Sequence, residues 1–159
     1  HLDRVSQYSV RAAQKLGLDK QAIKEVKDAA ELHDIGKIGI SDDILKKPSA
    51  LTEGETSIMD KHPIIGEAII KPVRRLSGLC DIIRHHHEWL NGSGYPDRLK
   101  GDEISIGAKI LCVADAFDAM TTDRSYRKAL SVDAAKAELE KYIGIRYDAK
   151  VVEAFLSVI

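Results

Sequence analysis

The chain has 159 residues, the size of a single domain, and 44% of them are hydrophobic, so it can bury a core without disulfide staples. Its 24 Lys and Arg against 25 Asp and Glu give a net charge of −1, which excludes the basic footprint of a duplex nucleic-acid binder. No apolar run approaches membrane-spanning length, so we expect neither a transmembrane helix nor membrane contact by this domain. Only 5% of the residues are aromatic, which favours a helical protein over a sandwich or barrel.

The start of the chain and its two cysteines predict the kind of parent protein and its cellular compartment. The chain begins at His1 without Met, so residues 1–159 are expected to be one domain of a longer sensor or response-regulator protein. Cys80 and Cys112 stand in apolar surroundings without a CxxC spacing, which indicates buried, reduced thiols. We therefore predict a cytoplasmic location, whether or not the parent protein is tethered to a membrane.

Helical spacing of apolar residues predicts the secondary structure of most of the chain. In chain order we expect a helix stopped by Gly17, a second helix from Asp19 to His33, and a short helical turn from Ser41 to Pro48. The next helix runs from the Thr52–Glu55 capping box to about Lys61, and Pro63 begins or kinks another. A helical face from Leu76 to His86, a long helix capped by Ser105, and helices near 132–142 and 149–159 complete the chain. Residues 90–104 are predicted to form a loop, and loops of that length are usually functional or disordered. The predicted fold is all-α, a single compact bundle of about seven helices.

Adjacent polar pairs at helix ends carry the candidate chemistry. His33-Asp34 ends one predicted helix, and His86-His87 ends another just before the glycine-rich loop. Asp115 lies in an apolar helix and, if buried, must be paired or metal-bound, although a solvent-facing aspartate is the commoner case. Imidazoles with carboxylates form a ligand set for iron, manganese or zinc, and the set exceeds what one tetrahedral ion needs. Two ions sharing a carboxylate would suit displacement at phosphorus.

Two segments carry a resemblance to a known family. His33-Asp34-Ile35-Gly36-Lys37 resembles the core motif of the HD phosphohydrolase superfamily, and His86-His87-Glu88 with the Gly94-Tyr95-Pro96 loop resembles its HD-GYP group. Matching residues continue through 113–121 and 123–129, so the resemblance covers nearly the whole chain. It implies an HD-type bundle and a bacterial phosphodiesterase that hydrolyses cyclic di-GMP to pGpG or GMP. It also implies two or three divalent metal ions, with iron expected first and manganese next.

The resemblance implies a role for each matched residue. One metal would be held by His1, His33, Asp34 and Asp115, and Asp34 would bridge to a second held by His62, His86 and His87. Asp34 and Lys37 are the predicted catalytic residues, with Lys37 at the scissile phosphate. The predicted substrate-binding residues are Gly94, Tyr95, Pro96, Asp118, Arg124 and Arg127, and Asp118 is expected either to orient a ligand or to touch substrate. The Gly-Tyr-Pro loop is also the expected surface for partner proteins such as diguanylate cyclases, and a homodimer is a further expectation.

Two other functions share parts of this pattern. Another HD hydrolase, acting on a different nucleotide, would use His33, Asp34 and Asp115 but would not need the Gly-Tyr-Pro loop. A catalytically silent module that binds cyclic di-GMP or a partner should have lost ligands, whereas every matched ligand is present here. Both alternatives rank below the phosphodiesterase.

Overall fold

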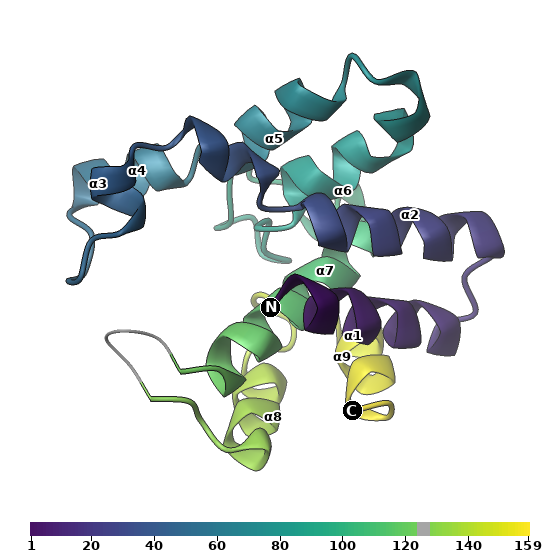
Figure 1. Cartoon of the computed structure of the whole chain (residues 1–159). Coiled ribbons are helices and arrows are strands. Elements are labelled where there is room, and N and C mark those ends of the chain that lie inside the picture. The colour runs from purple at the N-terminus through teal and green to yellow at the C-terminus, as the bar shows by residue number, and fades with distance from the viewer. Residues whose placement is uncertain (124–127) are drawn as a thin grey trace.

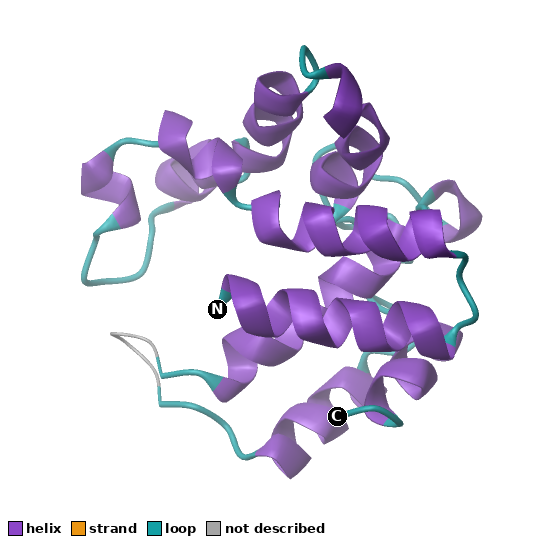
Figure 2. Cartoon of the chain, turned by 45° about the vertical axis from the view of Figure 1, so that its right-hand side comes forward, coloured by secondary structure: helices purple, strands orange, loops and turns teal. Residues whose placement is uncertain are grey.

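A computed structural model describes residues 1–123 and 128–159 of the chain. Within these residues the structure consists of helices joined by loops (Figure 2), with two isolated β-bridges and no strand. The α-helices are α1 (Leu2–Lys15), α2 (Lys20–Leu32), α3 (Asp42–Leu45), α4 (Glu53–Met59), α5 (His62–Ile70), α6 (Cys80–His85), α7 (Ile106–Thr121), α8 (Val132–Lys141) and α9 (Ala149–Leu156). The 3-10 segments are η1 (Ile35–Gly39), η2 (Arg74–Leu79) and η3 (Gly101–Glu103).

Side-chain caps explain where several helices begin. The Asp19 carboxylate accepts the Ala22 N–H at 2.8 Å, and Thr52 with Glu55 forms the expected capping box. Ser105 and Asp148 cap α7 and α9 in the same way. These caps satisfy backbone donors that have no partner inside the helix, so the helix starts agree with the predicted ones.

Helix α7 forms the centre of the bundle. It contacts α1, α2, α6, α8 and α9, and it crosses the middle of the molecule in Figure 1. Most of its side chains are buried, and Ile110, Leu111 and Val113 are fully buried. Such a helix is apolar around most of its circumference because it is surrounded by other helices. Any carboxylate on it must therefore find a partner.

The predicted all-α fold is confirmed, with differences in the short elements. The face from Leu76 to His86 is divided into the 3-10 segment η2 and the short helix α6, so it is not one helix. The predicted loop 90–104 contains η3 and an antiparallel bridge between Asn91 and Lys100. The part of the chain that the structure describes therefore has more helices than the seven or so expected, because short turns such as α3 count separately. None of the described helices is both long and apolar enough to cross a lipid bilayer.

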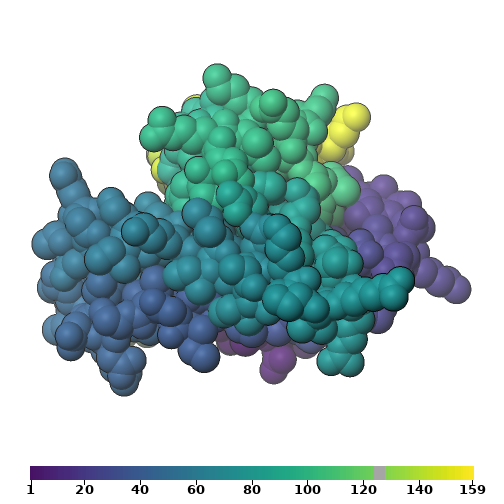
Figure 3. All heavy atoms as spheres, turned by 90° about the horizontal axis from the view of Figure 1, so that it is seen from above, coloured from purple at the N-terminus to yellow at the C-terminus, as the bar shows by residue number. Residues whose placement is uncertain are grey.

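Residues 41–59, hereafter the arm, stand apart from the bundle. They contain α3, α4 and the linker between them. The arm lies at the left of Figure 1 and projects from the body of the molecule in Figure 3, where it is blue. It joins the bundle through η1 on one side and α5 on the other, the two elements that carry Lys37 and His62. The arm is therefore anchored on either side of the candidate site.

Candidate metal centre

Most of the candidate ligands lie at helix ends, and Asp115 lies within α7. His33 and Asp34 stand between α2 and η1, and His62 is the first residue of α5. His86 and His87 follow α6, and Asp115 projects from α7. The chain changes direction at helix ends, so ligands that are distant in sequence can be brought to one place.

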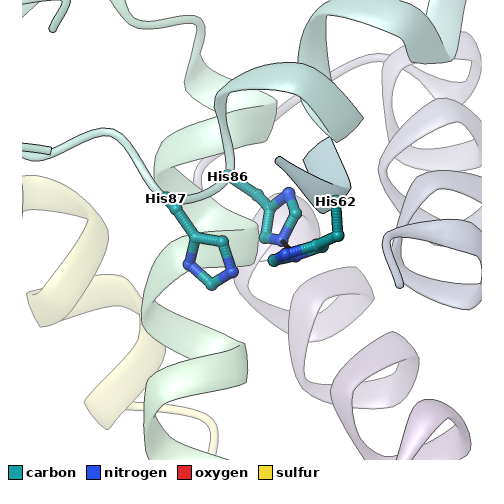
Figure 4. Close-up of side chains that lie close together, drawn as sticks. All are labelled: His62, His86 and His87. Carbon is teal, nitrogen blue, oxygen red and sulfur yellow. Dashed lines mark hydrogen bonds between the residues drawn. The ribbon is translucent and has the colours of Figure 1, made fainter. Parts of the chain in front are cut away.

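The ligands form two groups. The ligating atoms of His62, His86 and His87 lie within 4.8 Å of one another, and their three rings gather in Figure 4. A second group of the same compactness contains His1, His33 and Asp115, with the His1 Nε2 atom 3.4 Å from an Asp115 oxygen. Each group supplies three donors of the kind that divalent first-row metals take.

Asp34 lies between the two groups. Its Oδ2 atom is 3.7 Å from His33 Nε2, and its Oδ1 atom is 3.6 Å from His62 Nε2. The two oxygens of one carboxylate therefore face different histidine groups. This is the arrangement that a carboxylate shared by two cations requires.

Backbone hydrogen bonds determine which nitrogen of each ring faces the centre. The Nδ1 atoms of His33, His62 and His86 lie 2.7–2.8 Å from the carbonyls of Ala30, Met59 and Ile83, each three residues earlier. A carbonyl only accepts, so Nδ1 carries the proton, and Nε2 of each neutral ring presents a lone pair. Backbone carbonyls hold metal-ligating histidines in this way.

Two features of the ring nitrogens show that the residues fit a cation. The Nε2 atoms of His62 and His86 face each other at 3.4 Å without a proton to share. The buried Nε2 atom of His33 has no hydrogen-bond partner among the described residues. Buried polar atoms are rarely left unpaired, and metal ions bound to the two groups would satisfy all three nitrogens.

The pKa shifts differ between the two groups. Burial lowers the pKa of His62 and His87, and it lowers the pKa of His86 to about 3, so these three rings are neutral at physiological pH. Burial opposes charge on His33 as well, but Asp115 and Asp34 outweigh it and raise its pKa. Burial alone would raise the pKa of Asp115, but the neighbouring His33 outweighs it and holds this pKa far below its usual range. The carboxylates are thus ionised and favour positive charge beside them.

Asp118 is buried beside His1, one of the candidate ligands. Its side chain is 1% exposed, and one oxygen accepts from His1 Nδ1 at 2.7 Å. Its other oxygen binds the Arg4 guanidinium at 2.5 Å. Both oxygens are therefore occupied and buried, and the contact of Asp118 with substrate stays a prediction. The alternative, that it orients a ligand, agrees with the geometry.

A large cavity opens beside the two groups. Its volume is about 780 Å³, and it is lined by His1, Asp34, Lys37, Ile44, Leu45, Lys47, Ser49, Ala50, Leu51, Met59, His62, His87, Tyr95 and Asp115. The Lys37 ammonium donates to Asp34 Oδ2 at 2.6 Å. The predicted catalytic pair thus lies together at the cavity wall, and the size suits an organic ligand.

The Gly-Tyr-Pro loop packs against the second histidine group. The Tyr95 ring lies 4.9 Å from the His87 ring, and the Tyr95 N–H donates to the His87 carbonyl at 3.2 Å. A Cβ on Gly94 would lie 2.3 Å from Trp89 N and 2.5 Å from the His87 carbonyl oxygen. Gly94 is therefore required for close packing on the chain's own backbone, and its contact with substrate stays a prediction. Pro96 is half-buried behind Tyr95 and does not line the cavity, whereas Tyr95 does.

Glu88 holds this loop, a role that its sequence motif does not indicate. Its carboxylate is 2% exposed and accepts three backbone N–H groups, those of Asp97 at 2.6 Å, Arg98 at 3.0 Å and Leu99 at 3.1 Å. The carboxylate directly follows His87, so it links the loop to the ligand pair. Its acidic residue type was visible in the motif, but the three donors lie 9 to 11 residues away, with no local pattern to indicate them.

We expect Glu88→Gln to lower the free energy of unfolding by about 2 kcal/mol, because a buried amide in place of the carboxylate cannot accept all three backbone N–H groups. Glu103→Gln is the matched control, since Glu103 accepts one N–H, that of Lys100, at the exposed surface. Urea unfolding followed by Trp89 fluorescence measures both variants, and Trp89 is the chain's only tryptophan. Equal midpoints for the two variants would show that Glu88 does not hold the loop.

A cluster of charges anchors the same loop from outside. Asp97 binds the Arg84 guanidinium at 2.6 and 2.9 Å and His85 Nε2 at 2.9 Å. Arg84 also binds Glu67 at 2.6 Å. His85 lies outside both ligand groups found in the described residues. The cluster fixes Asp97 beside the backbone that Glu88 holds.

This cluster predicts a pH-dependent contribution to stability. The Arg84 hydrogen bond lowers the pKa of Asp97 to about 2. Since an unfolded aspartate titrates near pH 4, this stabilisation is complete above about pH 5 and is lost as the pH falls towards 2. Asp97→Asn should melt a few degrees below the unsubstituted protein at pH 7, and the difference should shrink by pH 3. A melting difference that does not depend on pH would contradict this assignment.

Arg124 and Arg127, predicted to bind substrate phosphates, lie outside the described residues. Of the remaining predicted residues, the structure brings all seven candidate ligands, Lys37 and Tyr95 to one site.

Fold and site together define a helical domain built around a histidine and aspartate centre suited to metal ions. A sequence profile of the HD domain matches residues 1–151. The chain belongs to the HD domain family, and its resemblance to the HD-GYP group is confirmed.

Known proteins resemble the chain over almost its full length. It is 44% identical to a protein of Thermotoga maritima named cyclic di-GMP phosphodiesterase, covering 98% of this chain and 43% of the relative. It is 40% identical to the 3'3'-cGAMP-specific phosphodiesterase 2 of Vibrio cholerae, covering 98% of this chain and 30% of that relative. The solved structure of Bd1817, an HDG"Y"P protein from Bdellovibrio bacteriovorus, superposes with a TM-score of 0.77 at 22% identity, over 98% of this chain and 50% of that one. The chain thus spans less than half the length of the Thermotoga maritima and Vibrio cholerae relatives.

Proposed function

We propose that this domain is a metal-dependent phosphodiesterase that hydrolyses cyclic di-GMP to pGpG or GMP. The observation that carries the proposal is the position of Asp34, whose two oxygens face two separate ligand groups at the wall of the cavity. The 44% identity to a named cyclic di-GMP phosphodiesterase supports the choice of substrate. The two free cysteines fit a domain that acts in the reducing cytoplasm.

We infer that His1, His33 and Asp115 hold one divalent ion, that His62, His86 and His87 hold another, and that Asp34 binds both. Nitrogen and oxygen donors without thiolate suit iron or manganese. When bound, two such ions activate a water molecule and neutralise phosphate charge.

The chain's own residues position the substrate. The Lys37 ammonium has further N–H donors beyond its bond to Asp34, and these can bind a non-bridging phosphoryl oxygen as negative charge builds up. Asp34 holds Lys37 in place at 2.6 Å. Tyr95, fixed against His87, offers its ring and hydroxyl to the nucleotide at the same cavity. Arg124 and Arg127 remain predicted phosphate contacts.

The test is direct hydrolysis. Anaerobically purified protein, loaded with iron or manganese, is incubated with cyclic di-GMP, and the products are separated by chromatography beside a metal count. We expect linear pGpG or GMP from the loaded protein and none after chelation. A filled centre without product would contradict the proposal and favour a cyclic dinucleotide-binding module.

A further inference from the structure

The cavity has two chemically different walls. The bundle side supplies five of the candidate metal ligands together with Lys37 and Tyr95. The opposite side comes from the arm, which contributes the apolar side chains of Ile44, Leu45, Leu51 and Met59. Ile44, Leu51 and Met59 are half-buried, and Leu45 is 37% exposed. We call these four residues the arm wall.

The arm wall is suited to a flat apolar group. Apolar side chains that line an open cavity gain free energy when a ligand removes them from water. The substrate of the proposed function carries charged phosphates and purine bases. With phosphate at the metal-binding side, a base on the same nucleotide would lie toward the arm, because one cavity of about 780 Å³ joins the two walls.

Lys47 is the single cation on the arm side of the cavity among the described lining residues. Its side chain is 24% exposed, and its ammonium donates to Glu55 at 2.6 Å. Glu55 in turn accepts the Thr52 N–H at 2.7 Å as part of the capping box of α4. The neighbouring Lys46 is 75% exposed, pairs with Asp42 and does not line the cavity. Lys47 is thus held at the cavity wall by a residue that the helix cap fixes.

The chemistry of an ammonium distinguishes the two purines. Lysine has three donors and no acceptor, so two donors remain after the bond to Glu55. Guanine presents O6 and N7, two adjacent acceptors, whereas adenine presents N7 beside the N6 amino donor. An N–H donor fixed opposite this edge can bind both acceptors of guanine. Opposite adenine, the lysine N–H faces the N6 amino donor, so adenine is disfavoured.

We propose that the arm wall holds a purine base of the substrate and that Lys47 selects guanine by donating hydrogen bonds to its O6 and N7 edge. This inference rests on the proposed function for the placement of the phosphate. It makes Lys47 a specificity-determining residue within a family group whose relatives include enzymes named for cyclic di-GMP and for 3'3'-cGAMP.

The test compares equilibrium binding of 5'-GMP and 5'-AMP to the manganese-loaded domain by calorimetry. We expect the unsubstituted protein to bind GMP about tenfold more tightly, the value of one hydrogen bond to a charged group. Lys47→Met should remove this preference by weakening GMP alone, and Lys47→Arg should keep part of it. Lys46→Met is the matched control and should retain the full preference. Leu51→Ser should weaken both nucleotides by a similar factor.

Other results would overturn the proposal. Equal weakening of GMP and AMP by Lys47→Met would place Lys47 at the phosphate, and no weakening would place it outside the site. Unchanged binding in Leu51→Ser would remove the arm wall from the base site. Hydrolysis of cyclic di-GMP is measured separately from nucleotide binding. A preference for GMP that depends on Lys47, in a protein that does not cleave cyclic di-GMP, would support the base site and reject the proposed phosphodiesterase activity.

Discussion

Asp34→Asn is expected to reduce hydrolysis of cyclic di-GMP at least 1,000-fold and to lower the bound metal. An asparagine has the same shape but carries one oxygen and no charge, so it cannot serve both ligand groups. The two Asp34 oxygens lie 3.7 Å from His33 Nε2 and 3.6 Å from His62 Nε2, and the amide would present a donor to one of them. The change also removes the ionic partner of Lys37.

Metal analysis and product chromatography on the same preparation measure both effects. Asp42→Asn is the matched control, because Asp42 pairs with Lys46 at 2.7 Å but its side chain is 73% exposed on the arm. Circular dichroism should show unchanged helix in both variants. Activity within tenfold of the unsubstituted protein in Asp34→Asn would reject a shared carboxylate as the basis of the site.

Gly36→Ala is expected to cost about 3 kcal/mol of stability and to displace His62. A Cβ at this position would lie 1.9 Å from the His62 carbonyl oxygen, 2.5 Å from Gly66 N and 2.8 Å from the His62 carbonyl carbon. All three atoms belong to the backbone of α5, so no side chain can move aside. The glycine in the segment after His33-Asp34 therefore lets η1 lie against the start of the helix that carries His62.

Gly54→Ala is the matched control. Gly54 lies in α4, a Cβ there would meet nothing within 4 Å, and alanine favours helix, so stability should be unchanged or slightly higher. Thermal unfolding should separate the variants by about 10 °C. Similar melting temperatures would show that η1 and α5 are not packed as closely as the structure has them.

The regular elements were predictable because their signals are local. Asp19, the Thr52–Glu55 box and Ser105 each cap a helix within three residues, and Gly17 has the positive φ of +75° that stops α1. The division of the Leu76–His86 face into η2 and α6 was not predictable, because both helix types place apolar residues three apart.

The site was predictable in its residue types but not in its supporting contacts. The histidine and aspartate pairs at helix ends indicated the ligands, and the structure gathers them. Asp118 lies three residues after Asp115 on one helix, so the sequence could not tell a substrate contact from a ligand contact. In the structure its oxygens bind His1 and Arg4, over 110 residues away, which favours ligand orientation. Glu88 and Gly94 likewise act through backbone that only the folded loop brings near.

Electron paramagnetic resonance of the manganese-loaded domain tests whether two metal ions share Asp34. We expect two manganese ions per chain with an exchange-coupled spectrum. His87→Ala and His33→Ala should each retain one ion with an uncoupled spectrum. A single ion per chain in the unsubstituted protein, or two ions without coupling, would contradict the shared centre.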